Sequence, residues 1–209
     1  MNLLFYGPPG TGKSELARYI AGTLNRELIC KRSSDLLDPY VGMTERNLAQ
    51  AFFEAETQEA VLVMDEVDSI LASRDRAHHT WEVSFTNELL AQMERFRGIL
   101  ICTTNRLMDL DQASIRRFNF KIGFNYLKPE GNLLFYRELL AHLATAPIEP
   151  SQFEDLQLIL DLAPGDFRVV RDRCSLSSPD QVPHAVLIAA LREEARAKKT
   201  HQGGKEIGF

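Results

Sequence analysis

The feature that most constrains the fold of this chain is a glycine-rich segment close to its first residue. Residues 7–14 read Gly-Pro-Pro-Gly-Thr-Gly-Lys-Ser, between an apolar run at residues 3–6 and a helix-forming stretch at residues 15–24. In a strand, glycine loop and helix arranged in this order, backbone N–H groups turn inward around an anion at the positive end of the helix. The spacing Gly-x-x-x-x-Gly-Lys-Ser in this context predicts a site for a nucleoside triphosphate.

This loop supplies the first set of candidate residues. The predicted nucleotide-binding residues are Gly7, Pro8, Pro9, Gly10, Thr11, Gly12, Lys13 and Ser14. The Lys13 ammonium is expected to neutralise the β- and γ-phosphates, and the Ser14 hydroxyl to bind Mg²⁺. The alternative is a Gly/Pro turn that precedes a helix by chance.

A pair of acids follows a second apolar run. Residues 60–64 read Ala-Val-Leu-Val-Met, as expected for a buried parallel strand, and Asp65 and Glu66 come directly after it. Two charges at the end of a buried strand are costly unless they hold a metal or do chemistry. Ligands bind at that end of a parallel sheet. We expect Asp65 to bind nucleotide-associated Mg²⁺ through water, and Glu66 to orient and deprotonate the attacking water.

Two later segments extend this pattern into a family resemblance. Residues 99–106 read Ile-Leu-Ile-Cys-Thr-Thr-Asn-Arg, and residues 110–118 read Leu-Asp-Gln-Ala-Ser-Ile-Arg-Arg-Phe. With the loop at residues 7–14, they make the chain resemble an AAA+ ATPase of the AAA type over most of its length. The paired arginine resembles that of the spastin and katanin branch.

The resemblance assigns further catalytic residues. It implies that Asn105 is the sensor 1 residue, which positions the attacking water near the γ-phosphate. It also implies that Arg116 and Arg117 are arginine fingers that complete the ATP site of a neighbouring subunit. The alternative is that the two arginines are surface cations at a helix end, where they favour the helix dipole.

A short loop after the second strand resembles pore loop 1 of AAA unfoldases and severing enzymes. Pro39 and Gly42 mark the loop, and the triplet Tyr40-Val41-Gly42 has the aromatic, hydrophobic and glycine residues of that element. The resemblance implies a grip on an extended polypeptide in the channel of a hexamer. The alternative is a tyrosine packed on the surface of its own domain.

A segment near the C-terminal end of the chain resembles a further nucleotide-contacting element, sensor 2. Gly165-Asp166-Phe167-Arg168 resembles the Gly-x-x-Arg sensor 2 pattern of wider AAA+ proteins, in which Arg168 would reach the γ-phosphate. AAA-type members usually have Gly-Ala there, so the chain departs from the spastin-like pattern. The alternative is that Arg168 pairs with acids on its own helix face.

The periodicity of the chain predicts two structural regions. Strands are expected near residues 2–6, 27–31, 60–64, 99–103 and 119–124, with helices near 13–24, 44–56 and 83–96. This alternation predicts an α/β fold with a parallel sheet, and the resemblance adds the P-loop NTPase strand order 5-1-4-3-2. Helices are then expected near residues 129–144, 151–162, 166–175 and 183–199. We therefore predict an α/β ATPase domain at 1–125, a helical lid at 126–200 and an irregular tail at 201–209.

Local signals refine the lid, and composition limits the function. Ser151 with Glu154 predicts a capping box, and Pro183 suits a first helical turn.

A net charge of −5 disfavours nucleic-acid binding. No apolar run approaches the ~20 residues of a membrane span. The three cysteines are widely spaced, which favours a reducing, cytoplasmic location without disulfides.

The whole pattern predicts an ATPase that binds ATP and Mg²⁺ and assembles into a homo-oligomer, expected to be a hexamer when full-length and ATP-bound. It would remodel or translocate a protein substrate through a central pore. Two alternatives stay open: a nucleotide-controlled assembly scaffold with little turnover, and a DNA-acting loader or helicase subunit. Family members carry a segment upstream of the first strand that helps to form the adenine pocket, so we expect this chain to be a C-terminal fragment of a larger protein.

Overall fold

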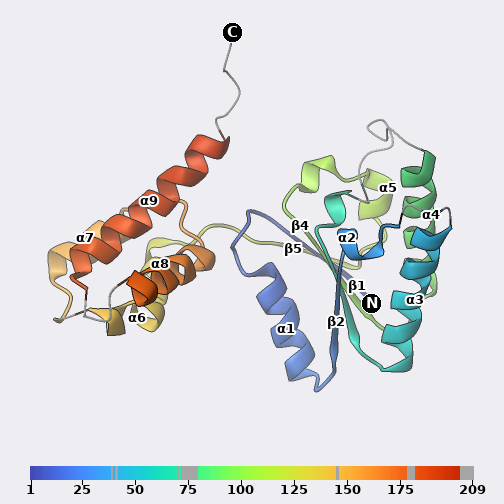
Figure 1. Ribbon diagram of the computed structural model, residues 1–209, viewed down its shortest axis with the longest axis horizontal. Coiled ribbons are helices and arrows are strands. Elements are labelled where there is room, and N and C mark those ends of the chain that lie inside the picture. The colour runs from blue at the N-terminus through green and yellow to red at the C-terminus, as the bar shows by residue number, and fades with distance from the viewer. Residues whose placement is uncertain are drawn as a thin grey trace, which may run out of the picture. The chain divides into compact units, whose positions relative to one another are not determined.

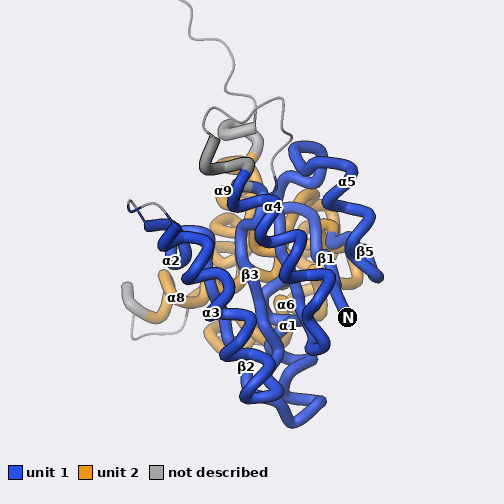
Figure 2. Tube along the Cα trace, turned by 90° about the vertical axis from the view of Figure 1, so that its right-hand side faces the viewer, with its two compact units in different colours: residues 1–8, 13–124 blue, residues 9–12, 125–209 orange. Residues whose placement is uncertain are grey.

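The computed structural model describes residues 1–38, 40, 42–69, 71, 80–144, 146–177 and 182–202. The chain divides into two compact units, coloured separately in Figure 2. Unit 1 comprises residues 1–8 and 13–124, and unit 2 comprises residues 9–12 and 125–209.

Unit 1 is built on a five-stranded parallel sheet (Figure 1). The strands are β1 (Asn2–Tyr6), β2 (Leu28–Arg32), β3 (Val61–Asp65), β4 (Ile99–Thr104) and β5 (Phe120–Gly123). Their order across the sheet is β2-β3-β4-β1-β5. This is the predicted order 5-1-4-3-2 read from the other edge, so the prediction of a P-loop NTPase fold is confirmed.

Helices cover both faces of this sheet. They are α1 (Lys13–Thr23), α2 (Ser33–Leu36), α3 (Met43–Thr57), α4 (Thr80–Arg95) and α5 (Gln112–Ile115), with the 3₁₀ turns η1 (Val67–Ser69) and η3 (Leu107–Asp109). On β3, Val61 and Val63 pack in the cluster that includes α1, whereas Leu62 and Met64 pack with α3 and α4. This alternation explains why the strand reads as an unbroken apolar run.

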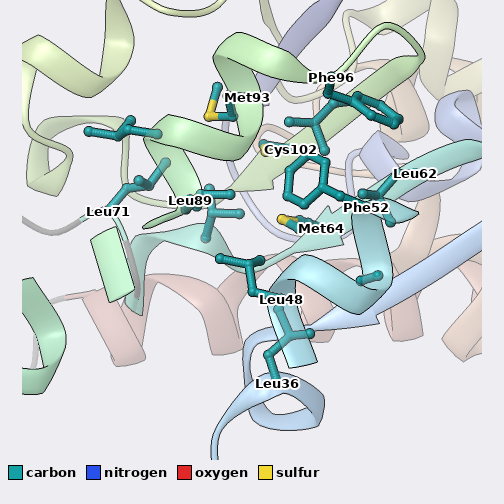
Figure 3. Packing of buried hydrophobic residues seen from close by; sticks show 14 of the residues in the cluster. Leu36, Leu48, Phe52, Leu62, Met64, Leu71, Leu89, Met93, Phe96 and Cys102 are labelled. Atoms are coloured by element: carbon teal, nitrogen blue, oxygen red, sulfur yellow. The ribbon is translucent and has the colours of Figure 1, made fainter. Parts of the chain in front are cut away.

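The larger of the two cores lies between the sheet and helices α3 and α4. Figure 3 shows Leu48 and Phe52 of α3 close to Leu62 and Met64 of the sheet. The Phe52 and Phe96 rings meet edge to face, with centroids 5.1 Å apart. Each such buried side chain stabilises the fold by about 1.5–3 kcal/mol relative to an exposed one. This packing holds β3 and β4 rigidly side by side.

The first glycine of the loop is required by its surroundings. Gly7 has a φ of +137°, and a Cβ atom built on it would lie 2.0 Å from the carbonyl oxygen of Phe124. Its backbone N–H donates to the carbonyl oxygen of Thr104 at 3.3 Å. Only glycine fits this position, where the chain leaves β1.

Unit 2 is helical and has a core of its own. It contains α6 (Pro129–Leu139), η4 (Ala141–Leu143), α7 (Pro150–Gln157), α8 (Pro164–Ser177) and α9 (His184–Gln202). Tyr136 and Phe167 are fully buried in its core. The Tyr136 hydroxyl lies 2.6 Å from His184 Nδ1, and His184 Nε2 lies 2.7 Å from the carbonyl oxygen of Ala146, which ties α9 to α6.

The start and end of α7 differ from the prediction. The N-cap is Glu149 rather than Ser151, and its capping-box partner is Gln152 rather than Glu154. Pro150 explains the earlier start because its fixed φ suits the first helical turn and its missing N–H needs no partner there. The helix also ends at Gln157, short of the predicted residue 162.

A buried amide satisfies the end of that helix. The Asn132 side chain, 1% exposed, donates from Nδ2 to the carbonyl oxygens of Leu156 and Ile159 at 3.1 and 2.9 Å. Such carbonyl groups have no partner within their own helix. Of the predicted tail, residues 201 and 202 belong to α9, and residues 203–209 lie outside the described residues.

Candidate active site

The carboxyl ends of the parallel strands bring the polar candidates of unit 1 together. Lys13, the first residue of α1, is only 8% exposed. Its ammonium donates to the carbonyl oxygens of Gly7 and Pro8, each at 2.8 Å, and to Asn105 Oδ1 at 2.7 Å. Three acceptors match the three N–H donors of the ammonium, which is how a buried cation is accommodated. The predicted phosphate lysine and the predicted sensor 1 residue are therefore in direct contact.

The electrostatic balance at Lys13 has two opposing parts. Burial lowers the pKa of the ammonium, and the nearby charges of Asp65 and Asp68 partly oppose this by raising it. Desolvation is the larger of the two effects. A further negative group placed against Lys13 would favour its charged form.

Asp65 lies at the end of β3 within reach of two hydroxyl groups. Ser14 Oγ is 3.4 Å from Asp65 Oδ2, and Thr103 of β4 donates a hydrogen bond to Asp65 Oδ1. The structure thus brings the two predicted magnesium residues, Ser14 and Asp65, together. Hydroxyl and carboxylate oxygens are ligands that Mg²⁺ prefers.

Glu66 combines an exposed side chain with a constrained backbone. Its φ is +59°, in the left-handed region, which costs a non-glycine residue roughly 1–2 kcal/mol. Ser33 Oγ donates to the Glu66 carbonyl oxygen at 2.9 Å, and the Glu66 N–H donates to Thr103 Oγ1 at 3.4 Å. The surroundings therefore hold this residue in an unfavourable conformation.

The end of β4 is held by a second threonine. Thr104 is 1% exposed, donates to Asp68 Oδ1 at 2.9 Å and accepts from the Arg106 N–H at 2.9 Å. These bonds fix the turn that carries Asn105 toward Lys13. Ser33, Thr103 and Thr104 were not predicted from the sequence to be site residues. The available signal was a run of hydroxyl residues at the ends of the strands beside the acid pair.

The two candidate finger residues differ in their surroundings. Arg116 follows α5 and is exposed, and its guanidinium has no hydrogen-bond or ion-pair partner among the residues that the structure describes. Arg117 is half-buried, and its Nε donates to Glu94 Oε1 at 3.0 Å while its NH1 group donates to the carbonyl oxygen of Ala113 at 2.9 Å. Arg116 alone is presented outward.

The Tyr40 loop is held by hydrogen bonds around Asp38, and its tyrosine side chain is exposed. The Thr44 hydroxyl accepts from the Asp38 N–H at 2.9 Å, and Asp38 Oδ1 accepts from the Tyr40 N–H at 2.9 Å. The Tyr40 side chain is 75% exposed, which disfavours the alternative of a tyrosine packed on its own domain. Gly42 caps α3 with a φ of +81°. Val41 lies outside the described residues.

The remaining candidates belong to unit 2. They are Pro9, Gly10, Thr11 and Gly12 of the loop, and Arg168 of α8. Gly10 and Gly12 have φ values of +75° and +97°, which suit a turn that points N–H groups inward. Gly10 also accepts a hydrogen bond from the Gly165 N–H at 2.9 Å. Arg168 is exposed, and its part in a nucleotide site stays a prediction.

The side chains of unit 1 fit a nucleotide together with a divalent cation. The charges of Asp65 and Asp68 act on Lys13, and Glu66 adds a third carboxylate directly after Asp65. A triphosphate alone would be repelled by these carboxylates. A divalent cation removes the repulsion, and Ser14 and Asp65 supply oxygen ligands for it.

Comparison with known proteins agrees with this site. Residues 3–126 match the model of the ATPase family associated with various cellular activities, abbreviated AAA. The chain belongs to the AAA family. It is therefore a nucleotide-binding ATP hydrolase, as the two motifs predicted.

Two curated relatives show how much of a longer protein the chain matches. It is 31% identical over 155 residues to the ATP-dependent zinc metalloprotease FtsH 2 of Thermoanaerobacter sp. (strain X514), which covers 71% of this chain and 30% of that protein. It is 32% identical over 147 residues to spastin of Xenopus tropicalis, which covers 66% of this chain and 24% of that protein. The match thus spans less than a third of either relative.

A solved structure shares the fold. The crystal structure of the FIGL-1 AAA domain in complex with ADP superposes with a TM-score of 0.70, over 95% of this chain and 76% of that one. The sequence identity is 21%, so this likeness shows the fold alone. No helix in the ranges that the structure describes is long and apolar enough to cross a membrane.

We expect nucleotide binding to take up a proton at alkaline pH. Burial lowers the pKa of Lys13 in the free protein, whereas phosphate charges raise it, so binding restores the proton. ATP affinity should then fall as the pH rises through the lowered pKa. Calorimetry in two buffers with different ionisation enthalpies should record the uptake. Lys13→Arg, which keeps its charge, is the control. A binding enthalpy that is independent of the buffer throughout the alkaline range would contradict this expectation.

Proposed function

We propose that this chain is the ATP-hydrolysing part of a ring ATPase that remodels a protein substrate or translocates it through a central pore. The observation that carries the proposal is the convergence of Lys13, Asn105 and the Asp65-Glu66 pair at one edge of the sheet. Family membership and the similarity to spastin and FtsH 2 support it. AAA proteins generally form hexamers, which we propose for the complete protein.

The residues of unit 1 divide the hydrolysis reaction among them. Lys13 binds the β- and γ-phosphates, and Ser14 and Asp65 would hold Mg²⁺, which would supply positive charge beside the phosphates. Glu66, whose side chain is exposed at the strand end, accepts a proton from the attacking water. Asn105 orients that water from the neighbouring strand. Positioning and electrostatic stabilisation account for most of the catalysis in phosphoryl transfer.

A neighbouring subunit completes the site in this proposal. Arg116 is exposed and has no partner in the described part of the chain, so its guanidinium is available to the γ-phosphate of another copy. Arg117 assists by holding the end of α5 through Glu94, and it can contribute directly after release from this weak surface pair.

The Tyr40 loop is proposed to contact the protein substrate. An extended polypeptide offers varied side chains, so a grip without sequence preference needs an apolar surface that several rings can share. The exposed Tyr40 ring provides a flat face of this kind. The hydrogen bonds of Asp38 with Thr44 and with the Tyr40 N–H restrain the backbone that carries this ring.

The first test concerns the catalytic base. Glu66→Gln should keep ATP and Mg²⁺ binding but lose roughly 10²-fold or more of the hydrolysis rate, because an amide cannot take the proton of water. Lys13→Ala should lose binding itself. The measurements are nucleotide titration and steady-state turnover at saturating ATP. Turnover of Glu66→Gln at the wild-type rate would falsify the assignment of the base.

The second test concerns assembly. Specific activity should rise with protein concentration, and Arg116→Ala should lower it by ~10³-fold, whereas Arg18→Ala, a control on α1, should not. An equimolar mixture of the Glu66→Gln and Arg116→Ala proteins should regain activity, because a site between two subunits can then contain both groups. If the mixture stays as inactive as its components, Arg116 does not act on a neighbour.

The third test separates protein translocation from the two alternatives. In the complete assembly, Tyr40→Ala should keep basal hydrolysis but lose its stimulation by an unfolded polypeptide, and Tyr40→Trp should keep both. Tyr19→Ala is a matched control, because Tyr19 is also 70% exposed but lies on α1. Stimulation by single-stranded DNA alone would indicate a DNA-acting protein. Unchanged responses in Tyr40→Ala would favour the scaffold.

A further inference from the structure

The conformation of Glu66 is the least expected feature of the site. In a strand, successive side chains point to opposite faces of the sheet, so Asp65 and Glu66 could not both point toward the same phosphate group if β3 simply continued. A left-handed residue directly after Asp65 breaks this alternation and redirects the second carboxylate. The φ of +59° at Glu66 is therefore a candidate part of the mechanism rather than an accident of the turn.

The first group that holds this conformation comes from the strand on one side. In the pairing of β2 with β3, Arg32 lies opposite Asp65, so the next residue of each strand is Ser33 and Glu66. Ser33 is 7% exposed and begins α2. Its hydroxyl donates to the Glu66 carbonyl oxygen at 2.9 Å, which is a bond of ordinary length and strength. This bond fixes the orientation of the peptide that follows Glu66.

The second group comes from the strand on the other side. Thr103 of β4 is 1% exposed, and its hydroxyl has one proton to donate, which goes to Asp65 Oδ1. The Thr103 hydroxyl oxygen in turn accepts a hydrogen bond from the Glu66 N–H at 3.4 Å, which is a longer and weaker contact. Thr103 thus couples the carboxylate of Asp65 to the peptide that precedes Glu66. The two peptides of Glu66 are held from both neighbouring strands.

We propose that Ser33 and Thr103 are positioning residues that hold the Glu66 backbone left-handed, so that its carboxylate lies where the attacking water is bound. This inference rests on the proposed role of Glu66 as the base. Without the Ser33 hydroxyl the following peptide is free to rotate, and the carboxylate moves with it. A displacement of about 1 Å at a reacting group can reduce the rate by roughly 10²-fold.

The two residues should give different kinetic signatures. The Ser33 hydroxyl donates to the backbone carbonyl oxygen of Glu66, so Ser33→Ala should lower kcat by about 10-fold to 100-fold and leave the Kd for ATP with Mg²⁺ unchanged within about twofold. Thr103 also contacts Asp65, so Thr103→Val should lower kcat and in addition raise the Mg²⁺ concentration needed for half-maximal activity. Ser33→Thr and Thr103→Ser keep a hydroxyl and should restore most of the rate.

The experiment measures turnover, nucleotide affinity and thermal stability for these four variants at the protein concentration where specific activity levels off. Ser175→Ala is the matched control, because Ser175 Oγ also donates to a backbone carbonyl oxygen, that of Arg171, at 2.9 Å, but on α8 of unit 2. This control should keep the wild-type kcat. A loss of kcat alone in Ser33→Ala, with recovery in Ser33→Thr or a matching Thr103→Val and Thr103→Ser pair, supports the proposal.

Two results would overturn it. If Ser33→Ala turns over ATP at the wild-type rate, the hydroxyl does not position the base. If kcat, ATP affinity and melting temperature all fall together in Ser33→Ala beyond the change in Ser175→Ala, the hydroxyl has a structural role only. The activity of the Glu66→Gln protein distinguishes a failure of the positioning proposal from a failure of the proposed function. An active Glu66→Gln rejects the base itself, whereas an inactive one with a fully active Ser33→Ala rejects only the positioning residue.

Discussion

The site depends on the pairing of one buried strand with a parallel neighbour on each side. β3 pairs with β2 and with β4, and the side chains of Val61 to Met64 are at most 1% exposed. Because the three strands run in one direction, they end at one edge, where Ser33 follows β2, Glu66 follows β3 and the Thr103-Thr104 pair ends β4. The buried apolar pattern of β3 and its backbone pairing with both neighbours fix the register of the strands, and that register decides which polar groups meet.

The buried Lys13 ammonium is accommodated by three hydrogen bonds rather than by exposure to water. The Lys13 ammonium is bound by three oxygens that carry no full charge, and burial lowers its pKa in spite of Asp65 and Asp68 nearby. An ammonium held in this way is poorly solvated, so little free energy is lost when an approaching phosphate displaces the neutral oxygens that bind it. A charged acceptor forms the stronger hydrogen bond. The local sequence thus prepares an anion site whose preference for phosphate follows from desolvation.

The α/β fold could be predicted from strong periodicity, and the family from its motifs, whereas the strand order came only from the resemblance to that family. Lys13, Asp65 and Asn105 could be placed at one edge since each ends or follows an apolar strand. Ser33 and Thr103 could not, because a hydroxyl at a strand end has many uses and its partner depends on register. The predicted start of α7 was wrong because Glu149 and Pro150 form a better helix N-terminus than the capping pattern at Ser151. Arg116 and Arg117 look equivalent in sequence, and the structure distinguishes them by the bonds of Arg117 to Glu94, distant along the chain, and to the Ala113 carbonyl oxygen.

The strain at Glu66 follows from the chemistry required at that position. A glycine would adopt the left-handed conformation without cost, but it has no carboxylate. Asparagine and aspartate tolerate that conformation better than most residues, yet the amide is no base and the aspartate side chain is one methylene shorter. A glutamate therefore has to be held there by its neighbours, and the hydroxyls of Ser33 and Thr103 hold the backbone without touching the carboxylate in the contacts described. The two hydroxyls thus act on the backbone that aims the side chain, and the side chain itself lies exposed at the strand end.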